Sequence, residues 1–565
     1  MVSTVSVGAR CLAVAAIFLA GVATAQAEWR RIDSPNFTVV GDVSASDLRE
    51  ITHRFENFRD VLSRVLTSKM TATAVPTVVI VFPSHNAFTP FKPRFNGKPI
   101  ELSGLFLPRR DANYIALVRD WDEGAMRVVF HEYGHLLTSN LTETLPVWLN
   151  EGLAEFYSTF QMVGDREALL GRPVPGHLEQ LNVRTLLPLE DLLNVRHDSP
   201  MYNEGDRRSL FYAQAWALTH MLLVGQPTGR DKLGAYVASL DAGITPGEAW
   251  RKAFAADRPD LALQNYVRRS VFSAYRLKFT ERAAGYEGSA APMARADAEA
   301  LLAHFLAQQQ RYDEAAERLQ RTAALDPDNQ WQRVVGALLA SGRQDPAAAA
   351  RGLSGLAAPA DWLLAYFAAN GLVDLLRDST ADMKATYRQS ARALFDSAQK
   401  ARGEIPNALA RLAWLDLNAE GPPSPEVLKA IQRARTLAPG RHDYAFVHAQ
   451  VLAEMGDFAA AATVIKSLVT PAVPADVSES ARGILQQIEA VQKRRAVRST
   501  LNGLTTAPPA VAGSGTAAGR EHSSPRPAMR LIGPGETQVE GTLERIECIG
   551  GNAVFVIRTP QAWHA

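Results

Sequence analysis

Cysteine is almost absent from this chain, which has two in 565 residues, Cys11 and Cys548. Cys11 lies in an N-terminal segment that we expect to be removed, so the mature chain would keep one thiol and no internal disulfide. That excludes a small secreted module stapled by disulfides. For a chain that is exported, the lack of disulfides would fit a bacterial periplasm better than a eukaryotic secretory route.

An excess of either charge is also lacking, because 60 basic residues stand against 59 acidic ones and the net charge is +1. This balance gives no reason to expect nucleic acid or a membrane surface as a partner. Hydrophobic residues make up 47% of the chain, enough to bury a substantial core. The length is sufficient for two or three domains.

Long apolar runs are missing after the N-terminus, so we expect no stable membrane span in the mature chain. The N-terminus itself has the pattern of an export signal: Arg10, an apolar run over residues 12–23, then small residues at Ala25 and Ala27. Residues 1–27 are therefore predicted to be a signal peptide. The alternative is a membrane anchor, but the apolar run is short for a bilayer. We expect an exported protein, periplasmic or secreted, from a bacterium.

Residues 28–285 have the pattern of one mixed α/β unit. Short strands are predicted at 37–40 and 75–82, and apolar residues at helical spacing predict a helix over 45–66. Residues 104–107 and 114–118 are expected to pair across a polar turn. Everything after Glu123 is expected to be helical. Strands first and helices afterwards indicate an α+β domain.

Residues 293–495 change in character and become rich in alanine and leucine. Residues 298–329 and 427–468 each have the pattern of two helices joined by a short turn, which resembles a tetratricopeptide repeat. The stretch between them, 331–420, is more degenerate. We expect an all-α helical-repeat domain that binds a protein partner or the substrate.

The C-terminal part contains two further predicted segments. Residues 499–534 are rich in Ser, Thr, Gly, Pro and Ala, which is typical of a flexible linker. Within residues 535–559, two runs of alternating polarity flank a Gly-Gly-Asn turn at 550–552. This pattern predicts a short C-terminal β-hairpin.

The strongest chemical signal is the sequence His131-Glu132-Tyr133-Gly134-His135 in a helical context. Positions i and i+4 of a helix lie on the same face, about 6 Å apart along its axis, so His131 and His135 can bind one Zn²⁺ together. Glu132 projects close to the same site, where it can take a proton from metal-bound water. The alternative is a helix with two ordinary histidines.

A second helix is predicted to begin at Pro146, with the sequence Trp148-Leu149-Asn150-Glu151-Gly152-Leu153-Ala154. The two motifs together resemble the gluzincin metallopeptidases, specifically the peptidase MA-like group, whose core is similar to that of aminopeptidase N and thermolysin. The resemblance implies a thermolysin-like fold for residues 28–285. It also implies that Glu151 is the third zinc ligand, that Glu132 is the general base, and that one Zn²⁺ is the cofactor.

Two further roles follow from the same resemblance. Glu155 lies one turn beyond Glu151, where thermolysin-like enzymes carry an acidic residue that orients a zinc-bound histidine; the alternative is a solvated carboxylate. Tyr212 matches a tyrosine that donates a hydrogen bond to the oxyanion in aminopeptidase N-like enzymes; the alternative is a packed helix residue. His220 is expected to be a core or surface histidine.

One departure from the family pattern concerns the substrate. The Gly-x-Met-Glu-Asn segment by which aminopeptidases anchor a free amino terminus has no counterpart between Leu102 and Asp122. The expected function is an exported zinc metallopeptidase acting on a peptide or protein. Two alternatives stay open: a zinc hydrolase with a non-peptide substrate, and a repeat-based scaffold whose zinc domain is structural or inactive.

Overall fold

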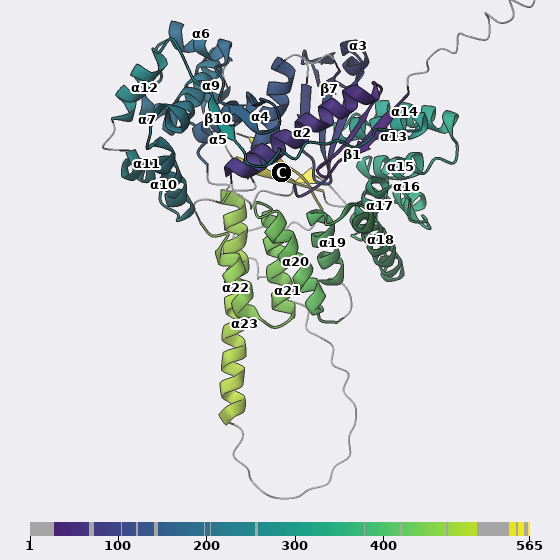
Figure 1. Ribbon diagram of the computed structural model, residues 1–565. Coiled ribbons are helices and arrows are strands. Elements are labelled where there is room, and N and C mark those ends of the chain that lie inside the picture. The colour runs from purple at the N-terminus through teal and green to yellow at the C-terminus, as the bar shows by residue number, and fades with distance from the viewer. Residues whose placement is uncertain are drawn as a thin grey trace, which may run out of the picture.

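The structure is a computed structural model that describes residues 28–66, 73–102, 104–119, 123–139, 145–196, 198–203, 205–254, 258–377, 379–417, 421–470, 473–504, 542–549, 552–558 and 563–564. The predicted signal peptide, residues 1–27, lies outside these residues, as does most of the predicted linker. In the described part the fold is mixed α/β and mostly helical, with one sheet at its centre (Figure 1).

A six-stranded sheet organises the first half of the chain, with the strand order β11-β1-β2-β3-β7-β6. Strands β2, β3 and β7 are parallel and the others are antiparallel. Every residue of β3 and β7 is buried, and their near-continuous apolar sequences are typical of parallel strands covered on both faces. The predicted pairing of residues 104–107 with 114–118 is confirmed. The strands are β1 (Arg30–Asp33), β2 (Phe37–Gly41), β3 (Thr77–Phe82), β6 (Gly104–Leu107), β7 (Asn113–Val118) and β11 (Ala291–Pro292).

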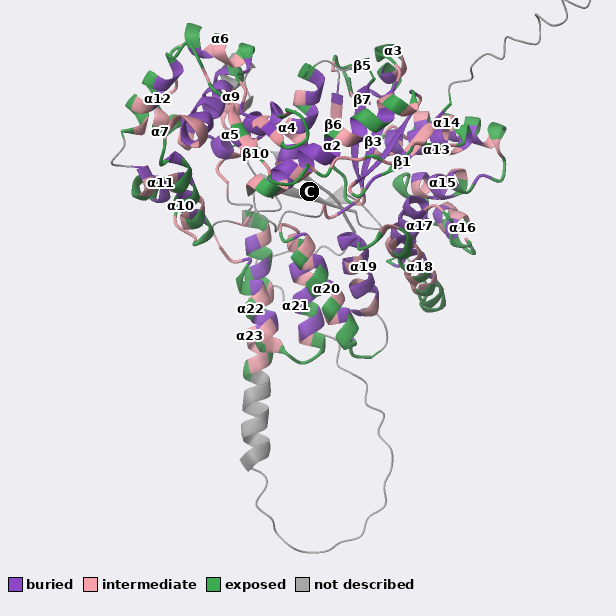
Figure 2. Ribbon diagram, in the orientation of Figure 1, coloured by how far each residue is buried: buried purple, intermediate pink, exposed green. Residues whose placement is uncertain are grey.

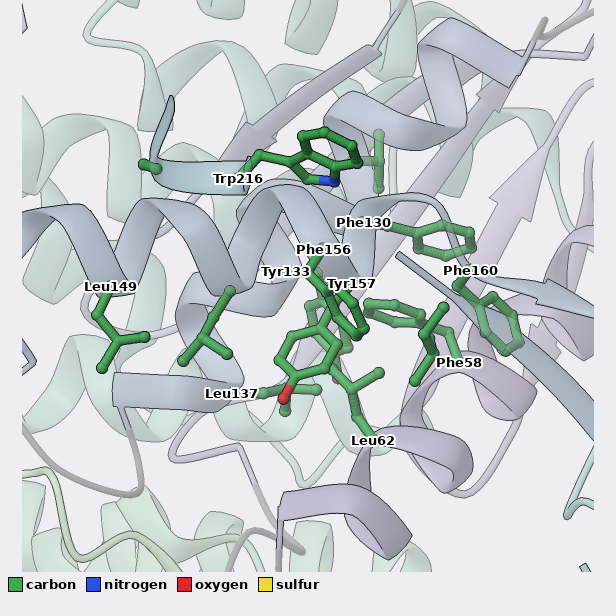
Figure 3. Close-up of a cluster of buried hydrophobic side chains, with 14 of the residues drawn as sticks. Phe58, Leu62, Phe130, Tyr133, Leu137, Leu149, Phe156, Tyr157, Phe160 and Trp216 are labelled. Atoms are coloured by element: carbon green, nitrogen blue, oxygen red, sulfur yellow. The ribbon is translucent and has the colours of Figure 1, made fainter. Parts of the chain in front are cut away.

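One face of this sheet packs against α2 (Ala45–Leu66) and α4 (Glu123–Ser139). Their contact is an aromatic cluster, in which the rings of Phe58 and Phe130 stack with centroids 4.2 Å apart (Figure 3). Arg59 donates to the buried hydroxyl of Tyr133 at 3.2 Å. This cluster fixes α4, the helix that carries both candidate metal-binding histidines.

The opposite face of the sheet is covered by α13 (Arg295–Gln308), the first helix of the predicted repeats (Figure 1). Phe305 packs on Tyr114 of β7 with ring centroids 5.4 Å apart, and the Tyr114 hydroxyl lies 2.6 Å from Nδ1 of His304. The chain therefore does not divide into separate cores at residues 285–293. The first repeat helix completes the core of the sheet.

The stretch after Glu123 is mainly helical, but the expectation of helices alone is wrong. A second, antiparallel sheet joins β8 (Gln161–Met162), β9 (Glu167–Leu170) and β10 (Tyr275–Lys278). Its strands are two to four residues long, and β9 pairs with a segment far along the chain, so local periodicity carries little sign of them. The helices here are α5 (Val147–Ser158), α6 (Pro175–Val183), α7 (Leu189–Leu193), α8 (Pro200–Asn203), α9 (Gly205–His220), α10 (Gly229–Asp241), α11 (Pro246–Phe254) and α12 (Pro259–Val267), with the π-helical turn η3 (Met221–Gly225).

The second half of the chain is a series of helices in which sequence neighbours pack on one another. They are α14 (Tyr312–Leu325), α15 (Gln330–Gly342), α16 (Pro346–Leu353), α17 (Trp362–Leu375), α18 (Ala381–Arg402), α19 (Pro406–Leu417), α20 (Pro425–Leu437), α21 (His442–Glu454), α22 (Phe458–Lys466) and α23 (Ala475–Leu504). Helical pairing is as predicted, and the assignment to tetratricopeptide repeats stays a prediction.

The C-terminal segments match the prediction except at one boundary. Helix α23 continues through Ser499 to Leu504, so the helix extends into the segment predicted as linker. The predicted hairpin is confirmed as the antiparallel strands β12 (Thr542–Ile549) and β13 (Asn552–Arg558), to which β14 (Trp563–His564) adds a third strand. None of the described helices is long and apolar enough to cross a membrane.

The remaining short elements lie between β3 and β6. They are α3 (His85–Phe88), the 3-10 turn η2 (Thr89–Phe91), β4 (Arg94–Phe95) and β5 (Lys98–Pro99).

Candidate metal centre

Helix α4 presents its two histidines on the side opposite its buried face. Phe130, Tyr133 and Leu137 recur at helical spacing and lie in the core (Figure 3). His131 and His135 are half-buried, and their imidazole rings meet edge to face with centroids 4.6 Å apart. The amphipathic pattern of the helix thus holds both imidazoles at the edge of the core, where a ligand can reach them.

Helix α5 brings Glu151 to these histidines. The helix is buried along almost its whole length (Figure 2), and of its residues only Asn150 is half-buried. The approach of α5 to α9 depends on Gly152, because a Cβ atom there would lie 2.1 Å from Thr219 Oγ1 and 2.5 Å from the Ala215 carbonyl oxygen. Glycine after the glutamate therefore lets α9, which carries Tyr212, pack directly on α5.

The three predicted ligands converge. Nε2 of His131 lies 3.1 Å from Nε2 of His135, and Glu151 Oε2 lies 3.3 Å and 3.2 Å from these two nitrogens. Three ligands in a tetrahedral shell with Zn–N distances of 2.0–2.1 Å stand about 3.3 Å apart. Among the described residues this is the one group of three or more His, Cys, Asp or Glu side chains arranged to hold a metal ion.

The hydrogen bonds around the site explain why a cation fits it. Nδ1 of His135 lies 3.2 Å from Asn150 Oδ1, and Nδ1 of His131 lies 3.4 Å from Glu155 Oε1. Both neighbours are acceptors, which favours the proton on Nδ1 and leaves a lone pair on each Nε2. Glu151 Oε2 is buried, and no N–H or O–H group of the described residues is placed to donate to it. Three lone-pair atoms facing one another repel unless a cation lies between them.

The charge state of Glu151 supports the same fit. Burial favours the neutral acid, but the imidazoles of His131 and His135 beside it outweigh burial, so the pKa of this carboxyl lies well below its ordinary value. Burial also opposes charge on His135, but the adjacent Glu151 carboxylate outweighs it and raises the pKa of His135. Glu151 is therefore an anion at neutral pH, as a metal ligand must be.

Glu155 lies behind His131, at the position implied by the family resemblance. Its second oxygen, Oε2, lies 2.9 Å from Nε2 of His177, so the carboxylate bridges two imidazoles. Burial raises its pKa, but the hydrogen bond and charge of His177 outweigh this, so the net shift is downward. His177 could not be predicted from the sequence, because a lone histidine on α6 has no metal-like spacing.

Two more side chains at the site were missed from the sequence. Asn150 belongs to the quoted motif, yet its role is visible only here: Oδ1 receives the Thr138 hydroxyl at 3.3 Å and also faces His135. Tyr202 of α8 donates to Glu151 Oε1 at 2.9 Å. No local pattern marks Tyr202, since it lies on a four-residue helix 51 positions after its partner.

Glu132 and Tyr212 line the same open cleft as His131, a space of about 520 Å³. The Tyr212 ring lies 6.1 Å from that of His131, centroid to centroid, and stacks on Tyr202. His220 is instead fully buried, with Nδ1 2.6 Å from the Tyr266 hydroxyl, and burial lowers its pKa to about 4. It is a core histidine, as expected.

The cleft continues into a larger space of about 1220 Å³ bounded by α2, α4 and the segment before α6. Arg127, Ser158, Gly176 and His177 line both spaces and so mark their junction. Together the two spaces form an open groove beside the metal centre, and its larger part exceeds the roughly 300–1,000 Å³ of a typical small-molecule pocket.

No protein-family model matches this chain, and no curated protein matches it significantly.

Proposed function

We propose that this chain is a zinc-dependent hydrolase that cleaves peptide bonds. The observation that carries the proposal is the convergence of His131, His135 and Glu151 at one point of a cleft that Glu132 also lines. Three protein ligands with an open cleft beside them are typical of a catalytic zinc site, whereas a structural zinc is enclosed by four.

Zinc bound by these residues would polarise a carbonyl group and make water a better nucleophile at neutral pH. Glu132 is proposed as the base that takes the proton of the attacking water and returns it to the leaving amine. Tyr212 lines the same cleft and is proposed to donate a hydrogen bond to the carbonyl oxygen as negative charge develops there.

Three other side chains are proposed to hold the ligands in place. Asn150 and Glu155 accept from the outer nitrogens of the two histidines, and Tyr202 holds the second oxygen of Glu151. Such partners fix the tautomer and orientation of a ligand, and their loss typically costs metal affinity or activity.

A peptide substrate is supported by the edge of the central sheet. β6 is the outermost strand beside β7 and packs on α4, since a Cβ at Gly104 would lie 2.9 Å from Val129 Cγ2. No strand in the described part of the chain pairs with its outer edge. An extended peptide can pair with such an edge through backbone hydrogen bonds. The helical pairs from α13 onward are proposed to bind the substrate protein or a partner.

The first experiment combines metal analysis of the purified protein with digestion of casein, an unstructured protein. We expect about one zinc per chain, casein cleavage, and loss of cleavage with a chelator that zinc restores. Zinc-loaded protein that leaves casein and other amide substrates intact would instead favour the binding scaffold. Cleavage that is indifferent to the chelator would contradict the metal mechanism.

A further inference from the structure

The junction of the two parts of the cleft contains an arginine that the proposed mechanism does not use. Arg127 lies on α4, four residues before His131, and lines both the space beside the metal centre and the larger space beyond it. Four residues span about 6 Å along a helix axis and return to the same face. The Arg127 side chain therefore starts from the metal-binding side of α4, one helical turn before His131, and lines the cleft there.

Arg127 differs from the other arginines of the cleft in having no hydrogen-bond or ion-pair partner among the described residues. Arg54 donates to Glu50 at 2.8 Å, and Arg172 donates to Glu123 at 3.3 Å. Arg127 forms no hydrogen bond or ion pair with any residue that the structure describes, and it is half-buried. A partly desolvated guanidinium with five unused donors is a strong site for a carboxylate, which it can bind in a bidentate manner.

The acidic groups near Arg127 do not neutralise it by contact. The positive charge of Arg127 contributes to lowering the pKa of Glu155, but the two carboxylate oxygens of Glu155 lie against His131 and His177 and do not contact the guanidinium. Glu132 lines the same cleft and, among the described residues, makes no hydrogen bond or ion pair with Arg127. The guanidinium N–H groups of Arg127 are therefore available to a ligand in the cleft.

We infer that Arg127 binds an acidic side chain of the substrate, so that the enzyme prefers aspartate or glutamate near the cleaved bond. This inference rests on the proposed function and adds the substrate class. An extended chain advances about 3.3 Å per residue, and Arg127 starts about 6 Å before His131 along the helix, so the acidic residue would lie about two or more residues from the scissile carbonyl. The groove continues past Arg127, which leaves room for the chain beyond the acidic residue and favours a side chain over a C-terminal carboxylate.

The test compares matched peptides that differ only in glutamate or glutamine near the cleaved bond, with the bond first located in a mixed peptide library. Wild-type protein should cleave the glutamate peptide with about tenfold higher kcat/KM, as expected for a charge-assisted hydrogen bond in a partly exposed site. Arg127→Ala should abolish that ratio mainly through KM, while Arg127→Lys should keep part of it. Zinc content should stay at the wild-type level in both. Arg49→Ala, which removes an exposed charge from α2 outside the cleft, is the matched control.

A binding measurement separates this inference from the proposed function. Fluorescein-labelled decapeptides with a central glutamate or glutamine are titrated into Glu132→Gln protein, with and without Arg127→Ala, and followed by fluorescence anisotropy. The glutamate peptide should bind about tenfold more tightly only when Arg127 is present. This comparison decides the role of Arg127 even if wild-type protein cleaves none of the peptides, which would count against the proposed hydrolase alone.

Three results would overturn the inference. In the first, Arg127→Ala protein keeps the preference for glutamate. In the second, it loses rate equally on both peptides, which would mean that Arg127 acts only by keeping Glu155 ionised and does not bind the substrate. The third is a preference that disappears when the peptide C-terminus is amidated and is insensitive to an internal glutamate. That result would identify a terminal carboxylate as the group bound.

Discussion

Gly152 lies at the contact between α5 and α9 and is adjacent to the proposed metal ligand Glu151. Its replacement by alanine should therefore affect both the stability of the fold and the metal centre. A Cβ atom at this position would lie 2.1 Å from Thr219 Oγ1 and 2.5 Å from the Ala215 carbonyl oxygen. The threonine can rotate away, but the carbonyl belongs to the backbone of α9 and cannot. Helices α5 and α9 must therefore separate in the variant.

The expected cost follows from typical values. Overpacking a tight core costs about 1–3 kcal/mol, and alanine returns up to about 1 kcal/mol through its higher helix propensity. We expect a net loss of about 1–2 kcal/mol, which lowers the melting temperature of a domain of this size by about 2–8 °C. Because Glu151 is adjacent to Gly152 and Tyr212 is on α9, weaker zinc binding should accompany the loss.

Gly134→Ala is the matched control for this prediction. Gly134 lies in α4 between the two histidines, and a Cβ there would meet Ala154 Cα at 3.8 Å, an ordinary contact. This variant should be neutral or more stable by up to about 1 kcal/mol. Both proteins are melted with zinc bound while the buried Trp148 and Trp216 are followed by near-ultraviolet circular dichroism. The packing argument is wrong if Gly152→Ala melts as high as Gly134→Ala.

Three further predictions concern the polar groups around the site and in the core. Tyr202→Phe removes the donor to Glu151 Oε1, so zinc affinity, measured by competition with a chelator, should fall about tenfold while the fold is kept. Tyr212→Phe should lower kcat by about 10²–10³ with zinc content unchanged, and an unaltered kcat would remove this residue from the mechanism. Burial lowers the pKa of His220 and His304 to about 4, against about 6.5 in the unfolded chain. Their contribution to stability is therefore complete above about pH 6.5 and is lost as the pH falls toward 4, and His304→Gln should flatten the pH dependence of the urea midpoint over that window.

Much of the fold was predictable where a pattern is local. The helix over 45–66 and the strands around 37–40 and 75–82 follow from the spacing of apolar residues, and the structure has them at nearly the same bounds. The second sheet was missed because β9 pairs with β10, a segment far away in sequence. The placement of α13 on the sheet was missed because a change in composition suggested a boundary where the core is continuous.

In the candidate site too, residues in local motifs could be predicted from the sequence, whereas contacts between distant segments could not. His131, His135 and Glu151 were predictable because one helical spacing and one short motif carry them, and the structure brings all three together. Tyr202 and His177 could not be found, since their contacts depend on how α8 and α6 fold back over α5. Arg127 could not be predicted, because an arginine on a helix is common and it is distinguished only by its position in the cleft without a hydrogen-bond or ion-pair partner among the described residues.

The zinc content and hydrolytic activity of Glu132→Gln protein, measured beside those of His135→Ala protein, test the proposed zinc mechanism. We predict that Glu132→Gln keeps about one zinc per chain and loses hydrolysis by a factor of about 10²–10⁴ or more, because the ligands are intact and the base is gone. His135→Ala should lose the zinc and the activity together. Undiminished hydrolysis by zinc-loaded Glu132→Gln protein would contradict the account.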